Sequence, residues 1–378
     1  MTKLLSFLFL AIMLLSSEKA IAEDGVTKNS ILIGQSITLQ GGKNDYGMAV
    51  VAGMEAYFSS INNRGGINGR QIVLKILDDD NKSDKAEANA RQLVEIEKAF
   101  ILFGSIEGGP STAVMKAANE LKVPFFGPLA GSPTLRRPHQ PLVFPVRAEH
   151  REEFRALMAQ GKSLGITKVA FLRSDSETGQ QHLANVKLLC DELSMKLVLD
   201  MPFKSDIKEA QLDAFAQQMD KVGAQMVLNH GGIGVYEILI RKVRIHSKHT
   251  AVYAVNSGSA QLVKKLGSLS QGIVFAQVVP SPWEKKAAIT REYQEEFAKA
   301  KPGQEFSYGS LEGYMTAKAL ALALRQAGQN LTRESFVANI KNASLDMNGL
   351  KINYKPDNHQ GLAFVDLSIV TYDGRFRH

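Results

Sequence analysis

The sequence is poor in the residues and motifs that carry covalent or metal chemistry. Among 378 residues there is one cysteine, Cys190, which excludes an intramolecular disulfide and any zinc or iron–sulfur site built from cysteines. The GxSxG, GxxxxGK and HExxH motifs do not occur, and the eight histidines include no pair spaced i, i+4 that would clamp a metal ion from one helix face. We therefore expect no catalytic residues, no metal site and no cofactor, and we expect Cys190 to be buried and inert.

Three stretches come close to known binding motifs and fail on detail. Gly231, Gly232 and Gly234 lack the third glycine of the dinucleotide fingerprint GxGxxG, which favours a turn at a helix start. Residues 78–81 (DDDN) look like the start of a calcium loop, but Ser83 and Asn89 stand where that loop requires a glycine and a glutamate. This favours a strand end leading into an acidic helix start. The basic cluster at 241–249 has no interleaved aromatic residues, so we expect a solvated helix face and no nucleic-acid binding.

The remaining composition is that of an ordinary globular protein, with 44% hydrophobic and 22% charged residues and a net charge of +7. At roughly 150 residues per domain, the length predicts about two domains. The sequence contains no short repeats, low-complexity tracts or flexible linkers, so we expect the two parts to be joined by ordered crossings.

One apolar run, residues 4–15, stands near the start of the chain. It follows Lys3 and precedes Ala20-Ile21-Ala22, which is the layout of a secretory signal peptide cleaved after Ala22. The alternative, a membrane anchor, is disfavoured because the run is much shorter than the roughly 20 residues that cross a bilayer. The residue directly after the cleavage site is not a cysteine, so a lipid anchor attached there is not expected. We expect residues 1–22 to be removed and the mature chain to be exported.

Apolar runs of strand length alternate with segments of helical period along the mature chain. This succession predicts parallel strands joined by helical crossovers, and hence sheets covered on both faces. The pattern runs once through about residue 146 and restarts at 168, which predicts an α/β fold with two doubly wound parallel-sheet lobes. The predicted strands are 31–37, 71–77, 100–103, 123–126, 168–173, 196–203, 225–229, 251–255 and 272–278. Long helical segments are expected at 284–299 and 309–326, and a last strand at 362–372.

Small polar residues fill three loops at the carboxyl ends of the first-lobe strands, where open α/β sheets bind ligands. The loops are 38–46, 104–112 and 129–134. In the second, glycines expose backbone N–H groups next to the hydroxyls of Ser111 and Thr112 at a helix start, which together favour a carboxylate site. The alternative is that Ser111 and Ser132 only cap their own helices.

At this point the chain resembles a known family. IGQSITL with Tyr46-Gly47, the stretch 56–80 (AYFSSINNRGGINGRQIVLKILDDD), and residues 103–138 and 143–153 are similar to the type I periplasmic substrate-binding proteins of branched-chain amino acid and amide ABC transporters. The resemblance implies a two-lobed clamp with three hinge crossings that closes on a small ligand and delivers it to a membrane permease. It implies discontinuous lobes, with 23–146 and 282–348 in lobe I and 147–281 and 349–378 in lobe II.

The resemblance also implies which residues contact the ligand. The ligand carboxylate would lie on the second and third loops, and Tyr46 would pack on the ligand. The candidates in the two loops are Ser105, Glu107, Gly108, Gly109, Ser111, Thr112, Ala130, Gly131 and Ser132. The candidates in the second lobe are Asp175, Thr178, His230 and Asn256.

Two departures from the amino-acid binders of this family bear on the ligand. Thr178 stands where they have an aromatic residue, and residues 255–257 offer no acid for a ligand ammonium group. A buried ammonium group without a counter-charge loses several kcal/mol, whereas micromolar binding is worth only about −8 kcal/mol. Glu107 or Asp175 could substitute for the missing acid. We therefore expect a small carboxylate or amide-type ligand in preference to a branched-chain amino acid.

Three function classes follow from these features. The favoured class is a monomeric periplasmic solute-binding protein that serves an ABC permease in the inner membrane. The second is a sensory ligand-binding protein that signals to a membrane receptor or regulator. The third, an exported enzyme, is disfavoured because no nucleophile–base motif is present.

Overall fold

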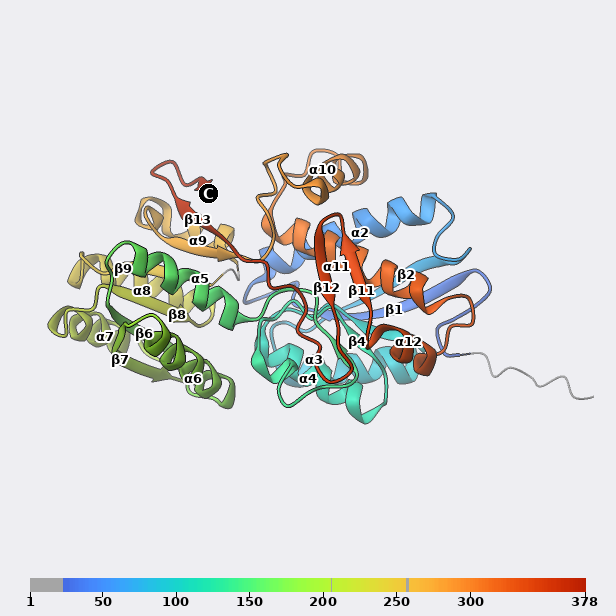
Figure 1. Ribbon diagram of the computed structural model, residues 1–378, viewed down its shortest axis with the longest axis horizontal. Helices are drawn as coiled ribbons and strands as arrows, with labels where there is room; N and C mark the ends of the chain where they lie inside the picture. Colours follow the sequence, from blue (N-terminus) through green and yellow to red (C-terminus); the bar gives the residue numbers. More distant parts are fainter. Residues whose placement is uncertain (1–22, 205, 256–257) are drawn as a thin grey trace, which may run out of the picture.

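Two sheets, one in each half of the molecule, form the framework of the fold (Figure 1). The computed structural model describes residues 23–204, 206–255 and 258–378. The predicted signal peptide and the candidate Asn256 lie outside these ranges. Each sheet has helices along its faces, and the chain passes between the halves more than once (Figure 1).

The first sheet consists of five parallel strands in the order β2-β1-β3-β4-β5. The strands are β1 (Ser30–Ile37), β2 (Gln71–Asp78), β3 (Ile101–Phe103), β4 (Phe125–Phe126) and β5 (Val143–Phe144). The helical segments between them are α2 (Asn44–Asn63), α3 (Ser83–Arg91), η1 (Gln92–Ile96), α4 (Gly108–Glu120) and η2 (Pro133–Leu135). The carboxyl ends of these parallel strands share one edge, and the three predicted ligand loops lie there.

The second sheet has the order β14-β13-β10-β9-β8-β6-β7. The five strands from β10 to β7 in this order are parallel, β13 pairs antiparallel with β10, and β14 pairs antiparallel with β13. The strands are β6 (Lys168–Ser174), β7 (Lys196–Phe203), β8 (Met226–His230), β9 (Ala251–Ala254), β10 (Val274–Gln277), β13 (Asp366–Val370) and β14 (Phe376–Arg377). The helical segments are α5 (His150–Ser163), α6 (Glu177–Glu192), α7 (Glu209–Lys221), α8 (Ile233–His246), α9 (Ser259–Leu266) and η3 (Gly267–Ser270). Two parallel-sheet lobes of an α/β fold are therefore confirmed.

The chain returns to the first half between residues 288 and 362. Its elements there are α10 (Ala288–Ala300), α11 (Tyr308–Ala327), α12 (Arg333–Ile340) and the hairpin of β11 (Ser344–Met347) and β12 (Leu350–Asn353). α11 is buried along nearly its whole length and packs on α2. Glycines allow the two helices to approach closely, since a Cβ at Gly53 would lie 1.9 Å from the Ser310 carbonyl oxygen and one at Gly313 would lie 2.1 Å from that of Val50.

The chain crosses between the halves at residues 145–149, 278–287 and 363–365. The third crossing differs from the predicted boundary, which assigned everything after residue 348 to the second lobe. Ile352, Tyr354 and Leu362 are buried in the same core as β1 and α11. The hairpin brings its apolar side chains onto α11, and the chain leaves the first half only after Leu362.

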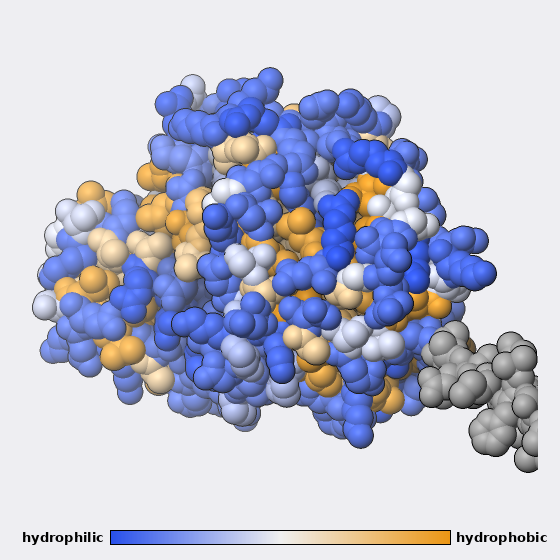
Figure 2. All heavy atoms as spheres, turned by 45° about the vertical axis from the view of Figure 1, so that its right-hand side comes forward, coloured by the Kyte–Doolittle hydropathy of each residue, from blue (hydrophilic) through white to orange (hydrophobic). Residues whose placement is uncertain are grey.

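The surface facing the viewer in Figure 2 is largely hydrophilic, with apolar side chains in several separate groups. None of the helices in the described ranges is long and apolar enough to cross a membrane. Cys190 is buried in the second half, as predicted, and burial raises the pKa of its thiol to about 11. The thiol is therefore protonated at neutral pH and a poor nucleophile.

Candidate ligand-binding site

A cavity of about 910 Å³ lies between the two halves and is lined by residues from both. Nine of the candidates line it, and they come from loops at the carboxyl ends of strands in the two sheets. They are Glu107, Gly108, Gly109, Thr112, Ala130, Ser132, Asp175, Thr178 and His230. The structure thus brings first-lobe and second-lobe candidates to one place, as expected for ligand sites in open α/β sheets.

Four other candidates lie elsewhere in the described part of the chain. The buried Ser105 hydroxyl donates to that of Ser111 at 2.7 Å, and neither residue lines the cavity. Gly131 lies against the imidazole of His150. Tyr46, expected to pack on the ligand, is buried outside the cavity, where its hydroxyl donates to a carboxylate oxygen of Glu312 at 2.6 Å.

The hydroxyls of Ser111 and Ser132 do not cap their helices, contrary to the alternative interpretation. Neither hydroxyl accepts a capping hydrogen bond, and that of Ser132 lies 2.8 Å from the Thr134 hydroxyl instead. The first-turn N–H groups of Gly108 and Gly109 have no acceptor within α4. The positive end of the α4 dipole therefore borders the cavity.

Glu107, the residue before α4, has an unusual backbone conformation, with φ of +65°. A non-glycine residue in this region costs about 1–3 kcal/mol and persists only where surrounding contacts hold it. The Glu107 carboxylate lies 3.0 Å from the ammonium group of Lys43, whose side chain is only 6% exposed. This ion pair fixes Glu107 and neutralises both charges at the cavity wall. Sequence reasoning included residue 43 in a ligand loop but did not find the pair.

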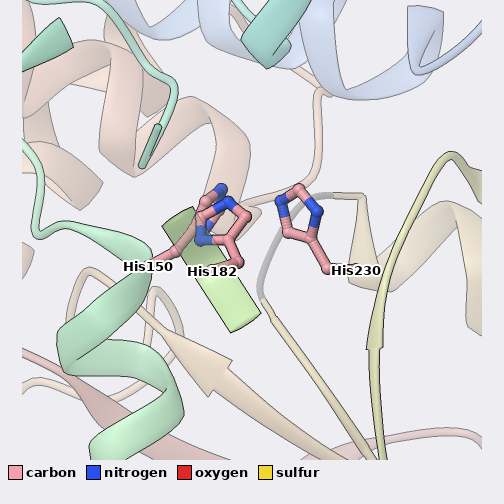
Figure 3. A group of neighbouring side chains, drawn as sticks. All are labelled: His150, His182 and His230. Carbon is pink, nitrogen blue, oxygen red and sulfur yellow. The ribbon is translucent and has the colours of Figure 1, made fainter. Parts of the chain in front are cut away.

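Three histidines that the search for i, i+4 pairs missed also meet beside the cavity (Figure 3). His150 is the first residue of α5, His182 belongs to α6, and His230 ends β8. The ring centroids are 5.3 Å apart for His150 and His182, 5.0 Å for His150 and His230, and 4.1 Å for His182 and His230. Burial lowers the pKa of each imidazole, so all three are neutral at neutral pH.

A buried polar network reaches from the first crossing to this cluster. Nη2 of Arg147 donates to Oε1 of Glu153 at 2.5 Å, and the same oxygen lies 2.9 Å from Nδ1 of His150. Arg147 also lies 3.7 Å from Glu312, which accepts from Tyr46. The hydrogen bond with Glu153 fixes the orientation of the His150 ring.

The family model described as a periplasmic binding protein matches residues 30–374. The chain belongs to the periplasmic binding protein family. The resemblance to the type I binding proteins of the branched-chain amino acid family is confirmed.

This periplasmic binding protein is 25% identical over 206 residues to Leu/Ile/Val-binding protein homolog 7 of Brucella abortus, an alignment of 48% of this chain and 50% of the relative. It therefore spans about half the length of the curated relatives it matches.

Among solved structures, an extracellular ligand-binding receptor from Verminephrobacter eiseniae has 24% identity and a TM-score of 0.81, with 92% of this chain and 100% of that chain covered. A fatty acid ABC transporter substrate-binding protein from Thermomonospora curvata has 19% identity and a TM-score of 0.81, with 94% and 92% covered. At these identities the structural likeness shows the shared fold.

Proposed function

We propose that this periplasmic binding protein captures a small carboxylate or amide-type solute in the cavity between its halves and delivers it to an ABC permease. The observation that carries the proposal is the α4 N-terminus at the cavity wall, where the Gly108 and Gly109 amides have no acceptor within the helix. Oriented N–H groups and a helix dipole together favour a carboxylate or carbonyl oxygen over a cation.

The charges at the wall disfavour an amino acid as the solute. Glu107, one of the two acids that could replace the missing ammonium partner, is already paired with Lys43. Asp175, the other, is exposed on the second-lobe side of the cavity, where water screens its charge. An ammonium group of the solute would lose its hydration in the cavity and find no unpaired, buried acid to compensate it. A solute whose only charge is a carboxylate does not need such an acid.

Membership of the family and the predicted signal peptide support delivery to a permease in the inner membrane. We propose that the mature chain does this as a monomer in the periplasm. Similarity to an ABC transporter substrate-binding protein supports this role. The alternative is a sensory protein that signals to a membrane receptor, and similarity to an extracellular ligand-binding receptor supports it. The same cavity would serve both roles. Uptake that depends on a permease distinguishes transport from sensing.

The solute class is tested on the purified mature chain, residues 23–378. Native mass spectrometry identifies any solute that is retained, and a thermal-shift screen compares simple carboxylates and amides with leucine, isoleucine and valine. We expect carboxylates or amides to raise the melting temperature more than the three amino acids. Strong stabilisation by the amino acids alone would contradict the proposal.

A pair of substitutions at one residue tests the helix N-terminus as the binding element. Gly108→Pro removes one N–H group at the first helical position, which proline tolerates, whereas Gly108→Ala keeps that group. A Cβ at Gly108 has open space, with the nearest atom 4.0 Å away. If the N–H group donates to a carboxylate, proline weakens binding about 10- to 100-fold, because such a hydrogen bond is worth roughly 1.5–3 kcal/mol. Equal affinities of the two variants would show that the solute does not contact this group.

A further inference from the structure

The three histidines at the cavity are arranged as metal ligands usually are. His150, His182 and His230 come from three different elements and point toward one another (Figure 3). One ring nitrogen from each lies within 4.8 Å of the others. Imidazole nitrogens are preferred ligands of Zn²⁺, Cu²⁺ and Ni²⁺, whereas Mg²⁺ and Ca²⁺ prefer oxygen.

The ring nitrogens of this cluster lack the partners that buried polar atoms normally have. His182 is fully buried, and neither of its ring nitrogens has a hydrogen-bond partner among the described residues. Nδ1 of His230 is also buried without a partner in those ranges. Each neutral imidazole carries one N–H donor and one lone pair, and burial without a partner is unfavourable for both. A bound metal ion would accept the nitrogen lone pairs that have no hydrogen-bond donor among the described residues.

His150 carries the supporting contact that metal-binding histidines typically have. Its Nδ1 lies 2.9 Å from Oε1 of Glu153, so Nδ1 donates to the carboxylate and Nε2 keeps its lone pair for a metal ion. Arg147 holds the same oxygen of Glu153 in place. Carboxylates in this position orient the imidazole and raise its basicity as a ligand.

We propose that His150, His182 and His230 bind one transition-metal ion of the Zn²⁺ class at the wall of the cavity, through three neutral imidazoles. A tetrahedral Zn²⁺ with Zn–N distances of about 2.0–2.1 Å holds its ligand nitrogens about 3.4 Å apart, so the rings approach one another on binding. His150 and His230 both line the cavity, which leaves the fourth position of the metal open to it. That position accepts water or an oxygen of an anionic solute.

The charged groups around the cluster are already paired with one another. Arg147 is bonded to Glu153, and Lys43 is paired with Glu107 at 3.0 Å. The ion therefore meets neutral ligands in a balanced environment, and an anion at the fourth position offsets its charge. The metal site does not depend on the identity of the solute, so it can be tested with metal alone.

The direct test is calorimetric titration of ZnCl₂ into the mature chain after metal removal with EDTA. We expect one Zn²⁺ per chain and a rise in melting temperature on binding. Replacement of a ligand, His182→Gln, is expected to weaken binding by about 100-fold or more, since loss of even an outer-shell partner costs about 10- to 100-fold. MgCl₂ and CaCl₂ are expected to produce no stoichiometric binding.

A matched control removes two histidines far from the cavity. His246 and His249 lie three residues apart at the end of α8 and in the turn after it, and are partly exposed. The double variant His246→Gln with His249→Gln is expected to bind Zn²⁺ with the affinity of the unmodified chain. Loss of binding in this double variant, or unchanged binding in the His182 variant, would assign the metal to the surface and overturn the proposal.

A second measurement needs no substitution and therefore does not depend on whether a variant folds. X-ray absorption at the zinc edge of the loaded protein is expected to show three imidazole ligands and one oxygen ligand. Fewer than three imidazoles, or no stoichiometric binding at all, would overturn the proposal. Solute binding by metal-free protein tests the proposed function separately, so the two ideas fail independently.

Discussion

Replacing Gly131 by alanine should destabilise the protein through one specific contact. A Cβ at Gly131 would lie 2.7 Å from Nδ1, 2.8 Å from Cγ and 2.9 Å from Cε1 of the His150 ring. These distances are well below van der Waals contact. The ring cannot yield easily, because Glu153 holds its Nδ1 at 2.9 Å and the His182 and His230 rings pack beside it.

The expected size of the effect follows from overpacking in a filled interior. Extra methyl groups in such places cost about 1–3 kcal/mol, so Gly131→Ala should lower the free energy of unfolding by that amount. Gly108→Ala is the matched control, since its Cβ would have no neighbour nearer than 4.0 Å. Replacing a glycine by alanine without strain stabilises a protein by about 0.4–1 kcal/mol. The same substitution should therefore lower the free energy of unfolding at Gly131 and raise it at Gly108.

The assay is urea unfolding of both variants and of the unmodified chain, with circular dichroism as the signal. We expect the unfolding midpoint to fall for Gly131→Ala and to stay or rise for Gly108→Ala, with similar slopes. The Gly131 variant should also bind Zn²⁺ more weakly, because a displaced His150 ring moves Nε2. If the Gly131 variant were as stable as the Gly108 variant, the packing of His150 on this loop would be refuted.

Three further predictions concern buried polar groups. Tyr46→Phe should lower the free energy of unfolding by about 1.5–3 kcal/mol, because it removes the hydrogen bond to the Glu312 carboxylate. Any solute that native mass spectrometry finds on the unmodified chain should also be found on this variant. Loss of that solute at unchanged stability would place Tyr46 in the site. Glu107→Gln should cost about 1–3 kcal/mol in urea unfolding because the Lys43 ammonium group loses its counter-charge at the cavity wall, and adding Lys43→Met should recover most of it; additive effects would refute the coupling. Burial lowers the pKa of His359 to about 4, below the unfolded value of about 6.5, so the folded state binds this proton less tightly and stability is lost as pH falls from about 6.5 to about 4. His359→Gln should make unfolding midpoints less dependent on pH in that window, and an unchanged dependence would contradict the assignment.

The sequence predicted the framework of the fold well because its signals are local. Alternating apolar runs marked every parallel strand through β10 except β5, which has only two residues, and helical periodicity marked most of the segments between them. The hairpin β11–β12 was not predicted, since its strands are four residues each and too short for a periodic pattern to be recognised. The third crossing was consequently placed too early in the chain.

The site divides along the same line. The predicted ligand loop 104–112 was found because topology alone places the carboxyl ends of parallel strands together. The role of Tyr46 was not, because its partner Glu312 lies 266 residues further along the chain. The histidine cluster joins residues from α5, α6 and β8, and no spacing within a single helix could have revealed it. Contacts between distant side chains require the packed structure.

The return of the chain to its first half has a consequence for synthesis. α11 follows α2 by about 250 residues, so at translation rates of about 5–20 residues per second the apolar face of α2 waits on the order of 10–50 s for its partner. The first sheet likewise waits for α12 and the hairpin to complete its core. Neither half can finish folding while the ribosome is still working. The nascent chain thus presents an unfinished apolar surface to chaperones until its last residues are made.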